Sequence, residues 1–393
     1  MAAGITDALF TGSQRRAEHA LRSGPVWWDE RFEGWAVSSH ALVTDVLRAP
    51  QVFSARELEV GPPAPHAETP ILRSLIGLDP PEHDRLREVV GMAFTPRALA
   101  QVDAAIEHTA AQLLLAGPVA ELDVVGGFAA PLTTSMIAQL LGLPTSRGAD
   151  LVRWTHVVAA FIGPIADDPA RRAEFRQVVA EMEAFLHESR TATIPSDTVL
   201  ATLSGACARG ELTERELLDF LILLIAAGHE TTTRLIYHAV LCLEREPTVL
   251  DALRERPERI AVFLEEVARF LPPTGGVDRF TAEATVLADR RIGRGERVVA
   301  LLAAANRDPA VFPDPHRFDP ERFDPARRPT RHLAFGRGVH VCLGAHLARR
   351  EARIALACLI EHVPGRWNVP ESGIGASTTP VGIDIHRMAL TTA

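Results

Sequence analysis

The stretch 335–344 reads Phe335-Gly336-Arg337-Gly338-Val339-His340-Val341-Cys342-Leu343-Gly344 and sets one cysteine among three glycines, just before a predicted helix. Glycines permit backbone turns that are closed to other residues and a close approach to a flat ligand or a sulfur atom. The segment 345–361 has apolar residues at helical spacing with arginines between them, which indicates an amphipathic helix. Cys342 therefore lies near a helix N-terminus, where the macrodipole and free N–H groups favour a thiolate.

A thiolate in this loop is compatible with three kinds of site. It could be the axial ligand of a heme, where sulfur donates electron density that favours O–O cleavage. It could bind zinc together with His332, His340 and His346, or act as a nucleophile with His340 as its base. An intracellular cysteine is also commonly a small buried apolar residue. The loop taken alone leaves these alternatives open.

The composition is that of a soluble globular protein large enough to enclose a deep cavity. The chain has 393 residues, of which 47% are hydrophobic and 23% charged. No linker, internal repeat or low-complexity tract divides it, so we expect one domain over residues 1–393. The net charge of -9 and the isoelectric point near 5.9 argue against a nucleic-acid-binding protein, which is usually basic over at least one domain.

All 41 basic residues are arginine, because the sequence contains no lysine. Reactions that need a Schiff-base lysine or a P-loop lysine are therefore excluded. The chain also lacks a G-x-G-x-x-G dinucleotide fingerprint, so a redox enzyme with this sequence would take its electrons from elsewhere.

Nothing in the sequence predicts a membrane protein. The longest apolar run, residues 220–228, is far short of the roughly 20 residues of a membrane span, and the N-terminus lacks a charged-then-apolar signal pattern. The four cysteines form no C-x-x-C pair, which suits a reducing compartment. We expect a soluble, cytoplasmic protein.

Helical patterns dominate the chain, and strand patterns are few. A helix is expected to open at Thr95-Pro96, an N-cap followed by a first-turn proline, and to run to about Leu113. Other expected helices cover 128–141, 171–190 and 257–270, and expected strands cover 34–38, 279–286 and 297–302. The predicted fold class is mainly α with small β-sheets (α+β), with the strands near 34–60, 279–302 and the C-terminus.

The longest predicted helix starts at Thr213, which forms a capping-box pattern with Glu216, and continues to about Glu244. Its middle reads Ala226-Ala227-Gly228-His229-Glu230-Thr231-Thr232. A glycine inside a helix costs about 1 kcal/mol relative to alanine, and a threonine bonded to an i-4 carbonyl bends the axis, so we expect a bulge or kink here. Gly228 would leave space for a ligand, with Glu230 and Thr231 as proton donors beside it. Alternatively, the threonines satisfy backbone groups and Glu230 points to solvent.

Two pairs at helical spacing are further candidates. Glu266 and Arg269 stand i, i+3, and form either a surface bridge of little value or a buried pair that needs a third partner, for which Arg322 is available. His83 and Arg87 stand i, i+4 in a helix begun by proline. Paired cationic donors suit a dianionic ligand edge, although a solvated charged face has the same pattern.

Together these windows resemble the cytochrome P-450 family of heme-thiolate monooxygenases. The family is marked by a Phe-Gly-x-Gly-x-His-x-Cys-x-Gly heme loop, an acid-threonine helix and a Glu-x-x-Arg helix, and this chain carries all three in family order. Further similar stretches are 35–54, 79–83, 305–309, 318–323 and 347–351. The resemblance spans nearly the whole chain and implies the cytochrome P-450 fold, with a long central helix over the heme.

The resemblance implies a heme b cofactor whose iron is bound by Cys342. Phe335 would pack near the heme, and the glycines Gly336, Gly338 and Gly344 would let backbone N–H groups face the sulfur and tune the iron's potential. The residues that match positions holding the heme propionates are His83, Arg87, Arg279 and His340. Those that match a structural network on the proximal side are Glu266, Arg269 and Arg322.

The resemblance also implies the reaction. Glu230 and Thr231 match the pair that governs proton delivery during reductive activation of O2, and their presence argues against a peroxide-driven relative. One oxygen atom would be inserted, by hydroxylation, epoxidation or dealkylation, into a mostly apolar organic substrate, perhaps in natural-product biosynthesis. The expected substrate pocket includes Leu223, Ala226, Ala227, Thr274, Gly275 and Val277, with the loop 57–75, residues 161–162 and residues 380–383.

Electron supply is the last expectation from the resemblance. The chain ends soon after the family's heme domain and shows no fused reductase, which implies a ferredoxin-like donor with its own NAD(P)H-dependent reductase. An acidic donor would dock at the face over Cys342, near Arg349 and Arg350. The alternative is a peroxide-using or non-catalytic heme-thiolate protein, and the remote alternative is a cysteine hydrolase.

Overall fold

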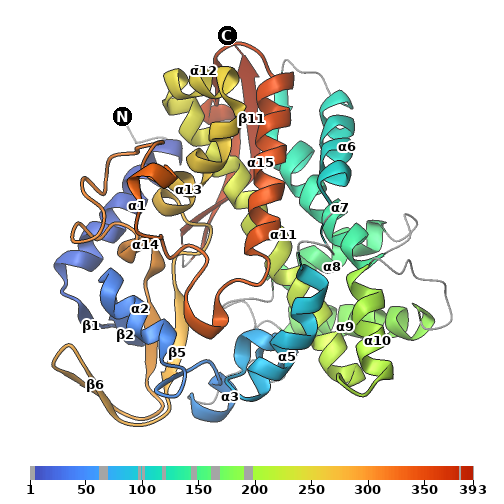
Figure 1. Cartoon of the computed structure of the whole chain (residues 1–393), viewed down its shortest axis with the longest axis vertical. Coiled ribbons are helices and arrows are strands. Elements are labelled where there is room, and N and C mark those ends of the chain that lie inside the picture. The colour runs from blue at the N-terminus through green and yellow to red at the C-terminus, as the bar shows by residue number, and fades with distance from the viewer. Residues whose placement is uncertain are drawn as a thin grey trace.

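The computed structural model describes residues 5–61, 70–95, 99, 102–116, 121–142, 148–160, 169–189, 198–379 and 382–392. Its α-helices are α1 (Ile5–Arg22), α2 (His40–Arg48), α3 (Glu57–Val60), α4 (Pro70–Arg73), α5 (Glu82–Gly91), α6 (Val102–Leu115), α7 (Ala130–Leu141), α8 (Gly148–Ala160), α9 (Pro169–Ser189), α10 (Val199–Ala208), α11 (Glu214–Arg245), α12 (Pro247–Glu255), α13 (Ile260–Phe270), α14 (Leu302–Ala305) and α15 (Ala345–His362). Its strands are β1 (Val26–Asp29), β2 (Gly34–Val37), β3 (Phe53–Ser54), β4 (Glu121–Asp123), β5 (Val277–Thr281), β6 (Thr285–Leu287), β7 (Arg290–Ile292), β8 (Arg297–Ala300), β9 (Trp367–Asn368), β10 (Ile374–Thr379) and β11 (Gly382–Thr392). Helices dominate, so the predicted fold class is confirmed (Figure 1).

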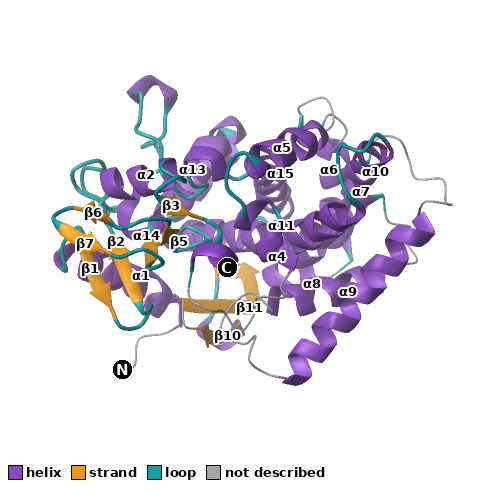
Figure 2. Cartoon of the chain, turned by 90° about the horizontal axis from the view of Figure 1, so that it is seen from below, coloured by secondary structure: helices purple, strands orange, loops and turns teal. Residues whose placement is uncertain are grey.

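The strands form three small sheets. The largest has the order β1-β2-β8-β5-β3, and only its β2–β8 pair is parallel. A second sheet joins β10, β11 and β4, with β9 also on β11, and β6 pairs with β7. Figure 2 shows the five-stranded sheet at one side of the molecule and most helices at the other. Most strands lie in the three regions where the sequence predicts them, whereas β1 and β4 lie outside these regions.

Helix α11 runs through the middle of the helical part. Its first half, from Leu217 to Ala226, packs in one apolar cluster, and its second half, from Leu235 to Leu243, packs in another. The predicted capping box is present, because Thr213 accepts from the Glu216 N–H and the Glu216 carboxylate accepts from the Thr213 N–H. This confirms the long central helix.

Two predictions about local structure are wrong. The expected strand 279–286 is two strands, because β5 stops pairing with β8 after Phe280 and β6 pairs with β7 instead. The expected bulge or kink at Gly228 does not interrupt the helix, because α11 is α-helical from Glu214 to Arg245. The back-bond of Thr231 to the Ala227 carbonyl is present at 2.9 Å, yet helical hydrogen bonding continues through it.

The structure contains one long apolar helical stretch among its described residues. Residues Val124–Leu141 are long and apolar enough to cross a membrane, and 61% of the stretch is buried inside the protein. It begins as a π-helix, Val124–Ala129, and continues as α7. Val124, Phe128 and Leu132 are fully buried in the apolar core. Its hydrophobicity is therefore accounted for by packing within the fold.

Candidate functional site

The cysteine loop has the backbone geometry that its glycines allow. Gly336 and Gly338 both have φ near +70°, and a Cβ at Gly338 would lie 2.2 Å from the carbonyl oxygen of Leu47. Only glycine fits at residue 338. The Cys342 N–H donates to the Phe335 carbonyl at 2.9 Å, and α15 begins at Ala345, as predicted.

The Cys342 side chain is accessible and lies close to a backbone N–H group and two arginines. The residue is exposed, and its sulfur accepts a hydrogen bond from the Gly344 N–H. Burial by the surrounding protein raises the pKa of the Cys342 thiol, while the Gly344 N–H, Arg87 and Arg349 oppose that rise. The predicted preference for a thiolate is thus outweighed by burial, although the opposing groups favour the deprotonated form that binds metals.

Buried nitrogen donors without partners lie close to this loop. His83 is completely buried, and its ring centroid is 4.4 Å from that of His340. Among the described residues, Nε2 of each ring has no hydrogen-bond partner, and His340 Nε2 is 3.7 Å from Oδ1 of Asp79. Arg279 is 7% exposed and donates to the neighbouring Asp278 carbonyl. Buried donors left unpaired are costly, so this group is suited to an anionic ligand.

Arg87, the remaining predicted propionate ligand, ties α5 to the cysteine loop. Its Nη2 donates to the Val341 carbonyl at 2.7 Å, next to Cys342 in sequence. The Arg349 guanidinium lies 4.0 Å from the ring centroid of Phe335 in the same loop. Residues from α5, β5 and the loop before α15 are therefore brought together, although they are more than 50 residues apart along the chain.

An accessible stripe runs along the middle of α11. Leu223, Ala227 and Thr231 follow each other at one-turn spacing and are partly or fully accessible, although most of the helix around them is buried. Ala226 does not share this stripe, because it is 3% exposed and packs in the apolar core. This burial does not support a pocket-lining position for Ala226, and its role stays a prediction. Gly228 faces Ile137, and a Cβ at this position would lie 3.5 Å from Cδ1 of Ile137, an ordinary van der Waals contact.

Glu230 lies beside a cation and does not point freely to solvent. Its carboxylate accepts a hydrogen bond from Arg234, one turn later on α11. Burial raises the pKa of Glu230, Arg234 lowers it, and Asp384 raises it. Within the described residues, the Thr231 hydroxyl donates to the Ala227 carbonyl and not to Glu230. The sequence did not indicate Arg234 or Asp384 as neighbours of the acid.

A second polar cluster on α11, missed by the sequence reasoning, faces α7. The Thr133 hydroxyl is 2.7 Å from Nδ1 of His229 and 3.0 Å from the hydroxyl of Thr233. All three side chains are buried. The cluster fixes α11 against α7 just beside Glu230.

The Glu266–Arg269 pair is buried and has the third partner that burial requires. Both residues are 0% exposed, with Arg269 Nε 2.7 Å from Glu266 Oε2 and Nη2 2.8 Å from Oε1. Arg322 Nε lies 3.3 Å from Glu266 Oε1, and Arg269 also donates to the Asn306 and Pro315 carbonyls. The surface-bridge alternative is thereby excluded.

The predicted pocket segment 274–277 precedes and enters β5. Thr274 and Val277 are partly exposed, Gly275 is exposed, and a Cβ at Gly275 would meet nothing within 4 Å. Residues 161–162, 62–69 and 380–381, which the same prediction includes, lie outside the described residues. The role of this segment stays a prediction.

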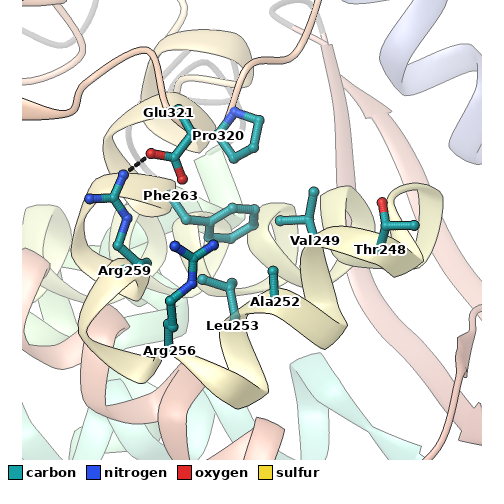
Figure 3. A pocket seen from close by; sticks show the side chains of 9 residues that line it. All are labelled: Thr248, Val249, Ala252, Leu253, Arg256, Arg259, Phe263, Pro320 and Glu321. Atoms are coloured by element: carbon teal, nitrogen blue, oxygen red, sulfur yellow. Dashed lines mark ion pairs between the residues drawn. The ribbon is translucent and has the colours of Figure 1, made fainter. Parts of the chain in front are cut away.

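Two cavities among the described residues have linings that do not include Cys342. One of about 100 Å³ lies between α12 and α13, where Arg259 pairs with Glu321 (Figure 3). The other, of about 280 Å³, lies beside α15; its lining includes Glu265, His346, Arg349, Arg350 and Arg353. Neither lining includes Glu230 or Thr231.

The zinc alternative is wrong. Over the described ranges, no three His, Cys, Asp or Glu side chains come together as a metal site. Both ring nitrogens of His332 are engaged, since Nε2 is 3.1 Å from Oε2 of Glu265 and Nδ1 accepts from the Ala334 N–H. This histidine supports the loop rather than a metal.

Comparison with known proteins decides the family. The Cytochrome P-450 family model matches residues 151–363. This chain belongs to the cytochrome P-450 family. It is 40% identical to Cytochrome P-450 107B1 of Saccharopolyspora erythraea over 74% of this chain and 70% of that protein. It is 33% identical to the mycinamicin IV hydroxylase/epoxidase of Micromonospora griseorubida over 94% of this chain and 91% of that protein.

A solved structure agrees with this assignment. CYP109E1 from Bacillus megaterium, in complex with testosterone, superposes with a TM-score of 0.85 at 31% identity, covering 98% of this chain and 99% of that one. The protein is therefore a heme-iron monooxygenase with the cytochrome P-450 fold, which uses an organic substrate, O2 and redox partners. The cysteine-hydrolase alternative is thereby excluded.

Proposed function

We propose that this cytochrome P-450 holds heme b through Cys342 and inserts one atom of O2 into a mostly apolar, fairly large organic substrate. The observation that carries the proposal is the exposed Cys342 in the same loop as His340, whose buried Nε2, like that of the adjacent His83, has no hydrogen-bond partner among the described residues and only a 3.7 Å contact to Asp79 at His340. A heme offers a metal for the sulfur and carboxylates for the histidines, so the residues present fit this group.

The proposed roles of the heme-binding residues follow from their contacts. His83, His340, Arg279 and Arg87 would hold the propionates, and Phe335 would pack beside the ring. The Gly344 N–H keeps the Cys342 sulfur polarised, and Gly336 and Gly338 shape the turn. Glu266, Arg269 and Arg322 would keep the proximal side rigid, because their network joins α13 to the irregular segment after α14.

Bound heme supplies the electron transfer and O2 activation that no side chain can perform. The chain itself must supply protons and exclude excess water. We assign this to Glu230 and Thr231, because Thr231 lies on the accessible stripe of α11 and the adjacent, partly exposed Glu230 is the neighbouring acid. The Thr231 hydroxyl is already oriented by the Ala227 carbonyl. Glu230 would carry protons inward, and Thr231 would direct them.

The substrate class is inferred from the stripe and from the relatives. Leu223, Ala227, Thr274, Gly275 and Val277 offer apolar or small surfaces with accessible space. One relative is a mycinamicin IV hydroxylase/epoxidase, and a similar solved structure is a complex with testosterone, an apolar steroid. Hydroxylation or epoxidation of a natural-product intermediate is the reaction that this combination supports best.

We further propose a single cytoplasmic heme domain over residues 1–393 that takes electrons from a ferredoxin-like protein. Arg349 and Arg350 are less available for docking than the sequence suggests, because each forms a two-pronged pair with an acid, Glu265 and Asp103 respectively. Arg353 and His346 beside the 280 Å³ cavity then carry more of the docking. A ferredoxin and an NAD(P)H-dependent reductase would complete the system.

The test is the reduced carbon monoxide difference spectrum of the purified protein. A heme-thiolate spectrum is expected, and Cys342→Ser should lose it while the fold is retained by circular dichroism. A colourless preparation, or a thiolate spectrum that survives in Cys342→Ser, would refute the proposal. NADH consumption with surrogate ferredoxin and reductase separates a monooxygenase from a non-catalytic heme protein.

The substrate class has its own test. A screen of substrate-induced spectral shifts should favour large apolar compounds, and tight binding only of small charged compounds would contradict the proposed class.

A further inference from the structure

One guanidinium joins three segments that are far apart in the sequence. Arg234 donates from Nη2 to Glu230 and, at 3.2 Å, to Oδ1 of Asp384, and from Nη1 to the Pro273 carbonyl at 3.2 Å. Asp384 is on β11, near the turn end of the β10–β11 hairpin. Pro273 directly precedes the 274–277 segment. Both contacts are therefore to residues directly next to the segments 274–277 and 380–383, which the sequence predicts to line the substrate pocket.

The charged groups of Arg234, Glu230 and Asp384 are partly shielded from water. The Arg234 side chain is 22% exposed, that of Asp384 32% and that of Glu230 36%. Partly buried charges are screened by salt much less than exposed ones. One turn further along α11, the buried Tyr237 hydroxyl accepts a hydrogen bond from the Ile385 N–H. Neighbouring residues of β11 are thus held by neighbouring turns of α11.

Arg234 is the cation that pairs with both carboxylates, Glu230 and Asp384. The charge of Glu230 depends on how Arg234 is shared, since Arg234 lowers the pKa of Glu230 while burial and Asp384 raise it. The other titratable groups that face this site are Tyr237 and His238. Burial raises the pKa of Tyr237 and lowers that of His238 to about 3, so both stay neutral near pH 7.

We propose that Arg234 is a positioning residue that holds Glu230 in its charged form and couples it to the β10–β11 hairpin. The inference rests on the proposed function, in which Glu230 carries protons during O2 activation. Glu230 can take up and pass on a proton only after it leaves Arg234. Asp384 makes that release easier, because it competes for the same guanidinium. A substrate that moves the hairpin thereby changes the hold on Glu230.

The first test is a pH profile. Heme-loaded full-length protein consumes NADH through a surrogate plant-type ferredoxin and its reductase, without added substrate, between pH 5 and 9. Arg234→Gln removes the charge that keeps Glu230 ionised, so the profile midpoint should rise by about one pH unit or more. Asp384→Asn should lower the midpoint, and Arg234→Lys should restore it toward the wild-type value. An unmoved midpoint in Arg234→Gln would overturn the inference.

The second test needs no turnover. Amide hydrogen exchange of residues 382–388 in the heme-loaded protein should become faster in Arg234→Gln and in Asp384→Asn, with no further increase in the double variant. Arg215→Gln is the matched control, because Arg215 pairs with Asp219 on the same helix at the same i, i+4 spacing. It should change neither the exchange nor the pH profile. Unchanged hairpin exchange in Arg234→Gln would contradict the coupling.

Glu230→Gln separates this inference from the proposed function. A flattened pH profile in that variant supports Glu230 as the proton carrier. If the profile then stays unmoved in Arg234→Gln, the coupling alone is overturned. A wild-type profile in Glu230→Gln would overturn the role of Glu230 and the coupling with it, while the carbon monoxide spectrum would still report the heme-thiolate independently.

Discussion

The imidazole rings of His83 and His340 lie with their centroids 4.4 Å apart, although His83 is on α5 and His340 is in the loop before α15. Each ring has a buried Nε2 atom that, among the described residues, has no hydrogen-bond partner. Two such donors side by side create a site for negative charge, because each would gain by pairing with an acceptor.

His83→Ala should weaken heme retention. A hydrogen bond to a charged group contributes about 1.5–3 kcal/mol, which corresponds to roughly tenfold to a hundredfold faster heme loss. The rate of heme transfer to an excess of an acceptor protein, followed by Soret absorbance, measures this. His187→Ala, at an exposed position on α9, should lose heme at the wild-type rate. Equal rates for both variants would argue against propionate binding by His83.

Glu266→Gln should destabilise the fold strongly. The substitution leaves the fully buried Arg269 cation without its anion, and breaking a buried pair in this way costs about 3–5 kcal/mol. Urea unfolding followed by far-ultraviolet circular dichroism measures the free energy of unfolding. Asp251→Asn breaks the exposed pair with Arg254 and should change that free energy by about 0.5 kcal/mol or less. Similar values for the two variants would show that the buried network is not structural.

Thr231→Ala should uncouple NADH consumption from oxygen insertion. Loss of a positioned proton donor should lower oxygen insertion by on the order of tenfold to a hundredfold and release hydrogen peroxide instead. A peroxidase-linked assay compared with NADH consumption gives the released fraction. Thr231→Ser keeps the hydroxyl that donates to the Ala227 carbonyl and should retain most of the coupling. Low peroxide release by the alanine variant would contradict the assigned role.

Glu351→Gln should make stability less dependent on pH. Glu351 is 3% exposed, and burial raises its pKa to about 8 from 4.5. Because the folded state holds this proton more tightly, the associated stability is fully present below pH 4.5 and is lost as the pH rises toward 8. The loss approaches about 1.4 kcal/mol per pH unit.

Urea unfolding of wild type and Glu351→Gln at pH 5 and pH 8 checks this expectation. The two proteins should differ little at pH 5, and the glutamine variant should be the more stable one at pH 8. Glu361→Gln, at an exposed position on the same helix, should follow the wild type at both values. A glutamine variant that loses as much stability as the wild type between the two pH values would refute the assignment.

Local rules predicted a good part of the fold and the site. The capping box at Thr213 and the helix after Cys342 depend on residues that are close in sequence, so spacing and backbone sterics are sufficient to predict them. Arg322 was expected to join Glu266 and Arg269, because a buried carboxylate between cations needs every available partner. The positions of Cys342 in its loop and of Glu230 and Thr231 on α11 follow from the same local patterns, while the roles of these residues stay predictions.

Other features of the structure depend on a distant partner, which the sequence pattern does not reveal. The strand expected over 279–286 is divided, because β8 and β7 offer separate edges for pairing. Ala226 is in the core and Ala227 is accessible, a distinction that depends on which neighbours pack against α11. Arg349 and Arg350, expected to be free for docking, are held by Glu265 and Asp103.

The sequence by itself therefore determined the family, the position of the cysteine loop before α15 and the helices that carry the acid, the threonine and the Glu-x-x-Arg pair, because these depend on local spacing. Only the tertiary structure decided that His83 meets His340 and that Arg234 connects Glu230 to Asp384. Those contacts join residues 257 and 150 positions apart. Such pairings arise when helices and strands pack, and no local pattern specifies which side chains then meet.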